Sequence, residues 1–318
     1  MDPKDYILSR LATLSAAEPA AGAGADLPEE ICRLVLSKKF RKYAVTDEYK
    51  EHIRSAIRTC VAAGEPIKLT LVFGGYKLWR LEEAPEPDWA ELFALLYYAQ
   101  WLKPIAAIYA PGVWLDFFSD DVIVERMNNI PAEATKQYRD VFTGLLAFIK
   151  PYLPANLSFT YNRVGDQYAD PADFTAELDA LIEEHSSQLS IPLTPEQIEA
   201  IEMNVKLEPG QADDPLWREK VNLIHDAYTK VSKRRPYYRT ADKIMVITRP
   251  IKDSLAVGTT KRSVVKFWIG AGVLLPDGDS FAETIYSPKQ VAHATFTSAD
   301  VDIAGLEGKN FKKIRIVQ

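Results

Sequence analysis

The sequence has 318 residues, 47% of them hydrophobic, which is enough to bury a substantial core and excludes a wholly disordered chain. The formal net charge is −6, with acidic and basic residues interleaved, so no broad cationic surface for nucleic acid or an anionic membrane is expected. Two cysteines and the lack of a long apolar run predict a protein of the reducing cytosol, neither secreted nor membrane-spanning.

The N-terminal part is predicted to be helical. A first helix covers about residues 3–17 and is followed by the small-residue stretch PAAGAGAD, which is typical of a linker. Residues 1–26 are therefore expected to be an appendage of helix and linker. Further helices are predicted at about 28–39 and 47–63, the second with Thr46 as its N-cap.

Strands and helices then alternate. The predicted strands are IKLTLVF, VWLDFF and LSFTY, at residues 67–73, 113–118 and 157–161. Helices are predicted between them, from Trp89 to about residue 103, from Val122, and again over residues 132–152. This order is typical of right-handed βαβ units, so we expect a Rossmann-like α/β fold with a largely parallel sheet flanked by helices.

The C-terminal half is predicted in two parts. Residues 171–232 contain three helix patterns and are expected to be an insertion or lid within a single catalytic domain of residues 27–318. A β-rich part completes the chain. Its predicted strands cover residues 243–249, 264–270, 273–275, 290–296 and 311–317.

Polar residues follow each of the three alternating strands, where the carboxyl ends of parallel strands meet and ligands bind. The glycines permit a positive φ or a close backbone approach, and Lys77 offers a point charge to a phosphate or carboxylate. We therefore predict a site at this edge of the sheet. Its candidates are Gly74, Gly75, Tyr76, Lys77 and Arg80 after the first strand, Ser119, Asp120 and Asp121 after the second, and Arg163 after the third.

Each of these signals also has a purely structural interpretation. Two glycines often form only a turn, and a following lysine is often solvated. Asp120 and Asp121 could cap the N-terminus of the next helix. The basic segment KRRPYYRTADK, residues 233–243, could hold a phosphate or form a solvated face. Lys266 interrupts an apolar run and points either to solvent or into a site.

Several familiar motifs are absent from the sequence. It contains no GxGxxG, no GxxxxGK[ST] and no GxSxG, which argues against a dinucleotide fingerprint, a P-loop and a nucleophile elbow. The four histidines are scattered without paired spacing, so a histidine-based metal site is not predicted. We expect each histidine to be structural or on the surface. The four histidines are His52, His185, His225 and His293.

The order of four short motifs resembles that of the isonitrile synthases of the pyoverdine/dityrosine biosynthesis group. That family has a strand ending in a segment with a lysine, a Pro-Asp-x-x-Glu helix start, a Tyr-x-Pro-Gly turn, and a strand ending in Ser-Asp-Gly. The counterparts here are FGGYK at 73–77, PDWAE at 87–91, YAPG at 109–112 and SDD at 119–121. The resemblance covers about residues 66–128, and Asp121 stands where the family has glycine.

The resemblance implies a Rossmann-like enzyme that joins an amino acid amine to a pentulose phosphate such as ribulose 5-phosphate, without a metal or redox cofactor. Under it, Lys77 and Arg80 would hold phosphate or carboxylate, and Asp120 or Asp121 would bind the amine or move protons. Tyr76 would be a proton relay or a wall of the site. A second anion site would consist of Arg249 and Lys266.

Two other functions stay open. A glycosyltransferase-like enzyme would use Asp120 and Asp121 with a divalent cation around the diphosphate of a nucleotide sugar. A non-catalytic, partner-binding α/β protein is favoured if Lys77, Asp120 and Arg249 are dispersed, because a catalytic crevice requires such groups to converge. The sequence does not decide the oligomeric state.

Overall fold

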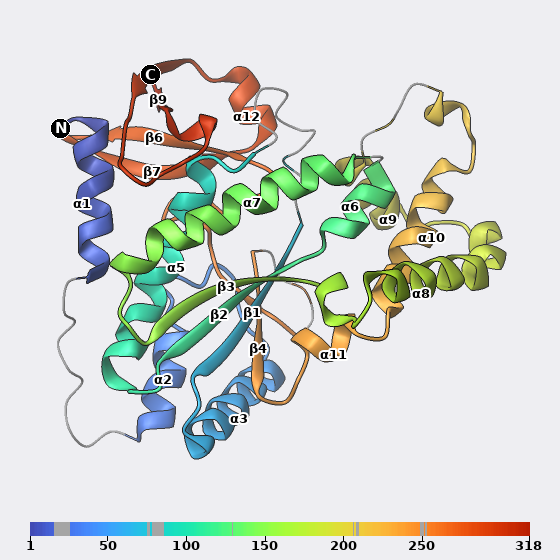
Figure 1. Ribbon diagram of the computed structural model, residues 1–318, viewed down its shortest axis with the longest axis horizontal. Helices are drawn as coiled ribbons and strands as arrows, with labels where there is room; N and C mark the ends of the chain where they lie inside the picture. Colours follow the sequence, from blue (N-terminus) through green and yellow to red (C-terminus); the bar gives the residue numbers. More distant parts are fainter. Residues whose placement is uncertain are drawn as a thin grey trace.

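The computed structural model describes residues 1–15, 26–74, 77, 86–128, 130–205, 207, 210–248, 251 and 253–318. Its central element is a five-stranded, all-parallel sheet with the strand order β3-β2-β1-β4-β5. The expected α/β class with a largely parallel sheet is confirmed (Figure 1). The strands are β1 (Ile67–Phe73), β2 (Val113–Ser119), β3 (Leu157–Arg163), β4 (Lys243–Ile247) and β5 (Leu255–Ala256).

The helices between the strands follow the predicted pattern closely. They are α2 (Leu27–Val35), α3 (Asp47–Ala63), α5 (Trp89–Ile108), α6 (Asp121–Asn128) and α7 (Ala132–Ile149). Thr46 caps α3, and its hydroxyl accepts from the Tyr49 amide. Helix α5 is apolar on almost every side because it packs both against the parallel sheet and against a second sheet.

That second sheet is mixed and has the order β7-β6-β9-β8. Its strands are β6 (Ala271–Asp277), β7 (Ser280–Tyr286), β8 (Phe296–Asp300) and β9 (Lys313–Val317). Strand β6 pairs with β7 antiparallel and with β9 parallel, and β8 pairs with β9 antiparallel. Strand β7 lies in a stretch for which no strand was predicted.

Two predicted strands of this region are wrong. Residues 264–270 form bends and a turn at 267–269 and no strand. Phe267 and Trp268 both pack their rings against Phe73, whereas adjacent strand residues would point to opposite faces. Within residues 290–296, the first four belong to α12 (Pro288–His293), which Ser287 caps, and only Phe296 enters a strand.

The N-terminal helix α1 (Pro3–Ser15) packs on the α/β body (Figure 1). It buries Ile7, Leu11 and Leu14 in the main core, and the Arg10 guanidinium lies 2.6 Å from the Glu283 carboxylate of β7. The division of the chain into units stays a prediction. No helix in the described part of the chain combines the length and apolarity that a bilayer crossing requires.

The helical segment before β4 lies beyond the carboxyl ends of β2 and β3 (Figure 1). It contains α8 (Pro171–Glu184), α9 (Pro195–Asn204), α10 (Trp217–Lys230) and the short α11 (Arg234–Tyr238). Helix α10 packs on α6, α8, α9 and α11. Tyr228 of α10 shares an apolar cluster with Phe118 of β2 and Met245 of β4. The segment is thereby held over the carboxyl edge of the sheet.

Candidate functional site

The strand order reverses between β1 and β4, since β2 and β3 follow on one side of β1, and β4 and β5 lie on the other. Such a reversal opens a crevice at the carboxyl ends of the two strands. A cavity of about 360 Å³ lies there, which we call the switch-point cavity. Its polar lining consists of Asp120, His225, Thr229, Arg234, Arg239 and Lys266, together with the rings of Tyr238 and Trp268.

Asp120 is the one carboxylate among the described residues that line this cavity. Its Oδ1 accepts from the Tyr228 hydroxyl at 2.5 Å and from Arg234 Nε at 3.3 Å, and its Oδ2 accepts from Arg234 Nη2 at 3.2 Å. Its backbone amide donates to the Phe73 carbonyl at 2.7 Å, which continues the β1–β2 pairing by one residue. The carboxylate is therefore fixed at the end of β2.

Several contacts also hold Arg234, the ion-pair partner of Asp120, in place. Its guanidinium lies 4.8 Å from the Tyr228 ring and 5.2 Å from the Tyr238 ring, and it donates to the Tyr238 hydroxyl at 2.9 Å. Its side chain is 12% exposed and that of Asp120 is 14% exposed, so the ion pair is largely removed from water. Burial, and then the Asp120 charge, raise the pKa of Tyr228 well above its usual value, which keeps this hydroxyl a donor.

The remaining polar lining is mostly basic. His225, Arg239 and Lys266 join Arg234 around the single carboxylate of Asp120. Arginine and lysine recognise phosphate and carboxylate oxygens, the first as a planar fork and the second as a point charge. The cavity therefore suits an anionic ligand of small-molecule size.

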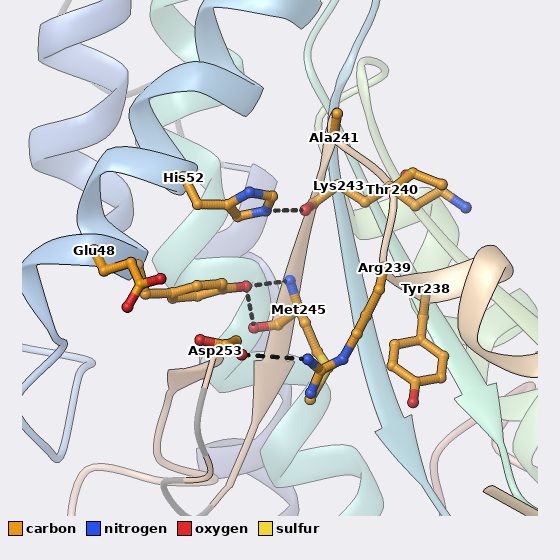
Figure 2. A pocket seen from close by; sticks show the side chains of 10 residues that line it. Glu48, His52, Tyr238, Arg239, Thr240, Ala241, Lys243, Met245 and Asp253 are labelled. Atoms are coloured by element: carbon orange, nitrogen blue, oxygen red, sulfur yellow. Dashed lines mark hydrogen bonds and ion pairs between the residues drawn. The ribbon is translucent and has the colours of Figure 1, made fainter. Parts of the chain in front are cut away.

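A second cavity, of about 390 Å³, shares lining residues with the first. Figure 2 shows the side chains that line this second cavity. It lies between α3 and β4, and we call it the α3 cavity. Tyr238, Arg239 and Met245 line both cavities, so these three residues form a shared wall. Glu48 and His52 of α3 and Asp253 of the β4–β5 loop complete the charged and ionisable lining, with Lys243 of β4.

Lys77 lines neither cavity, and its side chain is fully buried. Its ammonium donates to Glu91 Oε2 at 2.7 Å and to Asp88 Oδ1 at 3.0 Å, and Tyr138 donates to the other oxygen of Glu91 at 2.9 Å. The interpretation of Lys77 as a solvated lysine is therefore wrong. Lys77 is thereby tied to the capping box at the start of α5. Its catalytic role stays a prediction.

Asp121 points away from Asp120. Its Oδ2 lies 3.4 Å from Arg163 and 3.7 Å from Arg139, and burial raises its pKa to about 6 although both arginines act against that shift. The two aspartates thus engage different cations and do not form a joint pair for a diphosphate-bound metal. The described residues contain no group of three or more side chains suited to hold a metal ion.

The structure brings three predicted residues, Gly74, Asp120 and Lys266, to the switch-point cavity. Ser119 is buried, and Arg163 pairs with Asp121 and Asp166. The predicted candidates Gly75, Tyr76, Arg80 and Arg249 lie outside the described residues.

Sequence reasoning missed the contributions of α10 and α11. His225 was expected to be structural or on the surface; it is exposed, as expected, and it also lines the switch-point cavity. Arg234 and Arg239 lie in the basic segment 233–243, for which phosphate binding was one of two open interpretations. That signal was present in the sequence, but nothing in it separated cavity residues from solvated ones.

Comparison with known proteins gives one finding on fold. No protein-family model and no curated protein sequence matches this chain. Among solved structures, the crystal structure of the PvcA protein from Pseudomonas aeruginosa matches with a TM-score of 0.66 and 14% sequence identity. The match covers 92% of this chain and 100% of that one. Over nearly its whole length, this chain is therefore similar in fold to PvcA.

Proposed function

We propose that this chain is an enzyme that joins the amine of an amino acid to a pentulose phosphate, in the manner of isonitrile synthases. The observation that carries the proposal is the basic switch-point cavity on this fold. Two further facts support it. The motif order over residues 66–128 resembles that family, and the fold is similar to that of PvcA over nearly the whole chain.

The phosphate of the sugar would bind the basic side of the cavity. Arg234 is paired with Asp120, and Lys266 and His225 are the further lining groups that would meet the phosphate oxygens. A lysine ammonium binds phosphate as a point charge through charge-assisted hydrogen bonds. The aromatic walls, Tyr238 and Trp268, would exclude water from the sugar carbon that reacts.

Asp120 would carry protons during the condensation. Condensation begins when a neutral amine nitrogen attacks the sugar carbonyl carbon, and the resulting carbinolamine then loses water to give an imine. A carboxylate beside the reacting carbon can take a proton from the attacking nitrogen and return it to the departing hydroxyl. Tyr228 and Arg234 would hold the Asp120 carboxylate in place through three hydrogen bonds and balance its charge.

The test is a thermal-shift screen of the purified protein with pentulose phosphates, amino acids and nucleotide sugars, followed by mass spectrometry of any product. A ligand at about 100 times its dissociation constant adds about 2.7 kcal/mol of stability. We expect stabilisation by a pentulose phosphate and a product that needs an amino acid as well. Stabilisation only by a nucleotide sugar with manganese would instead favour glycosyl transfer.

A further inference from the structure

Arg239 stands in the wall shared by the two cavities, and its side chain is 25% exposed. Its guanidinium makes no hydrogen bond within the described part of the chain. Among those residues its one ion pair is with Asp253 at 3.6 Å, and it lies 5.9 Å from the Tyr238 ring. A guanidinium in a cavity that makes no hydrogen bond to the surrounding described residues can donate two parallel hydrogen bonds to a bidentate acceptor, above all a carboxylate.

The position of Asp253 is unusual. Its φ is +62°, a left-handed value shared by no other non-glycine residue among those described. Aspartate tolerates this conformation better than most residues, yet it still carries a backbone cost, and such costs gather at functional sites. The turn presents the Asp253 carboxylate to Arg239 across the α3 cavity (Figure 2).

The other polar groups of the α3 cavity are mainly acceptors. Glu48 projects from α3 and, like Asp253, carries a negative charge (Figure 2). His52 Nε2 bonds the Lys243 carbonyl at 2.9 Å, which leaves Nδ1 of a neutral imidazole as an acceptor. The Lys243 ammonium is engaged, since it donates to the Tyr237 carbonyl at 2.6 Å and lies 4.1 Å from the Tyr237 ring.

The charged groups that line the α3 cavity favour a zwitterionic ligand over a phosphate dianion. A phosphate dianion would meet two carboxylates here, whereas a zwitterion would place its carboxylate on Arg239 and its ammonium near Glu48 and Asp253. Tyr49, Tyr238 and Met245 supply apolar surface for a side chain. A volume of 390 Å³ suits a molecule of amino-acid size, near the lower end of the usual range for ligand pockets.

We infer that the α3 cavity is a binding site for a free α-amino acid, with Arg239 as the residue that binds its carboxylate. This inference rests on the proposed function for the role of that amino acid, which would supply the amine to the sugar phosphate in the adjoining switch-point cavity. The shared wall of Tyr238, Arg239 and Met245 is where the two ligands would approach each other.

Calorimetry tests the inference with the standard amino acids as separate probes, each compared with its methyl ester, which lacks the carboxylate. We expect at least one amino acid to bind the wild-type protein and its ester to bind far more weakly. Arg239→Gln should weaken that binding about ten- to a hundredfold, because two charge-assisted hydrogen bonds are lost. Glu48→Gln should weaken binding of the amino acid but not of its deaminated acid.

Arg235→Gln is the matched control, because Arg235 is an exposed arginine of the same segment that lines neither cavity. Equal losses in both arginine variants, equal binding of ester and acid, or no binding at millimolar concentration would overturn the inference. The proposed function fails separately. If binding depends on Arg239 but no product forms, the amino acid site is supported and the proposed function is contradicted. If product forms and Arg239→Gln has an unchanged KM for the amino acid, the site is contradicted and the proposed function is supported.

Discussion

The Lys77 ammonium lies 2.7 Å from the Glu91 carboxylate, and neither side chain is exposed to solvent. Asp88 is the third member of this buried group, 3.0 Å from the same ammonium. Two carboxylates face one cation, and burial raises the pKa of Glu91 to about 7 against the opposing effect of Lys77. The group joins Lys77 to the start of α5 and, through Tyr138, to α7.

The first prediction concerns the stability of this group. Lys77→Met should lower the free energy of unfolding by about 3–5 kcal/mol, because it leaves Glu91 and Asp88 buried without their cation. Urea denaturation measures the loss, with the exposed Arg235→Gln variant as a control that should change by under about 0.5 kcal/mol. A stable Lys77→Met protein that has lost only turnover would instead place Lys77 in the reaction.

The second prediction concerns pH. The folded-state pKa of Asp121 is about 6, above the ordinary 3.8, so the native protein binds this proton more tightly than the unfolded chain does. The resulting stabilisation is complete below about pH 3.8 and is lost as the pH rises through 6, by about 3 kcal/mol at most.

Urea titrations of the wild-type protein and Asp121→Asn between pH 4 and 7 measure this difference. The stability of the wild-type protein relative to the variant should fall over that range and level off above it. Parallel curves for the two proteins would show that Asp121 titrates normally.

The third prediction concerns the carboxylate in the switch-point cavity. Tyr228→Phe removes one hydrogen-bond donor to Asp120 and keeps the ring that packs on Arg234. It should cost about 1 kcal/mol of stability and lower kcat with little change in KM for the sugar phosphate, because Asp120 loses one of its anchors. Steady-state kinetics with the substrates found in the screen provide the measurement. An unchanged kcat would exclude a positioning role for Tyr228.

The fourth prediction concerns the backbone at Asp253. Glycine adopts a φ of +62° without steric strain, whereas alanine in this conformation is strained by about 1–2 kcal/mol. Asp253→Gly should therefore be more stable than Asp253→Ala by about that amount. Thermal denaturation of the pair gives the difference, and both variants lose the same carboxylate. If alanine proves as stable as glycine, the residue does not hold this conformation in solution.

The sequence by itself determined the alternation of strands and helices from β1 to β3 and the parallel sheet that follows from it. These features depend on local periodicity and capping, such as Thr46 at the start of α3, and local patterns are visible in a sequence. The same reasoning located Asp120 at the carboxyl end of β2, where the cavity lies.

Only the tertiary structure decided which polar side chains reach the cavity. Asp120 and Asp121 are neighbours in sequence, yet they face different cations, since one residue of chain at a helix start turns the side chain to another side. The partners of Asp120, Tyr228 and Arg234, are 108 and 114 residues away. Contacts over such separations depend on how α10 and α11 pack on the sheet, and no local pattern encodes that packing.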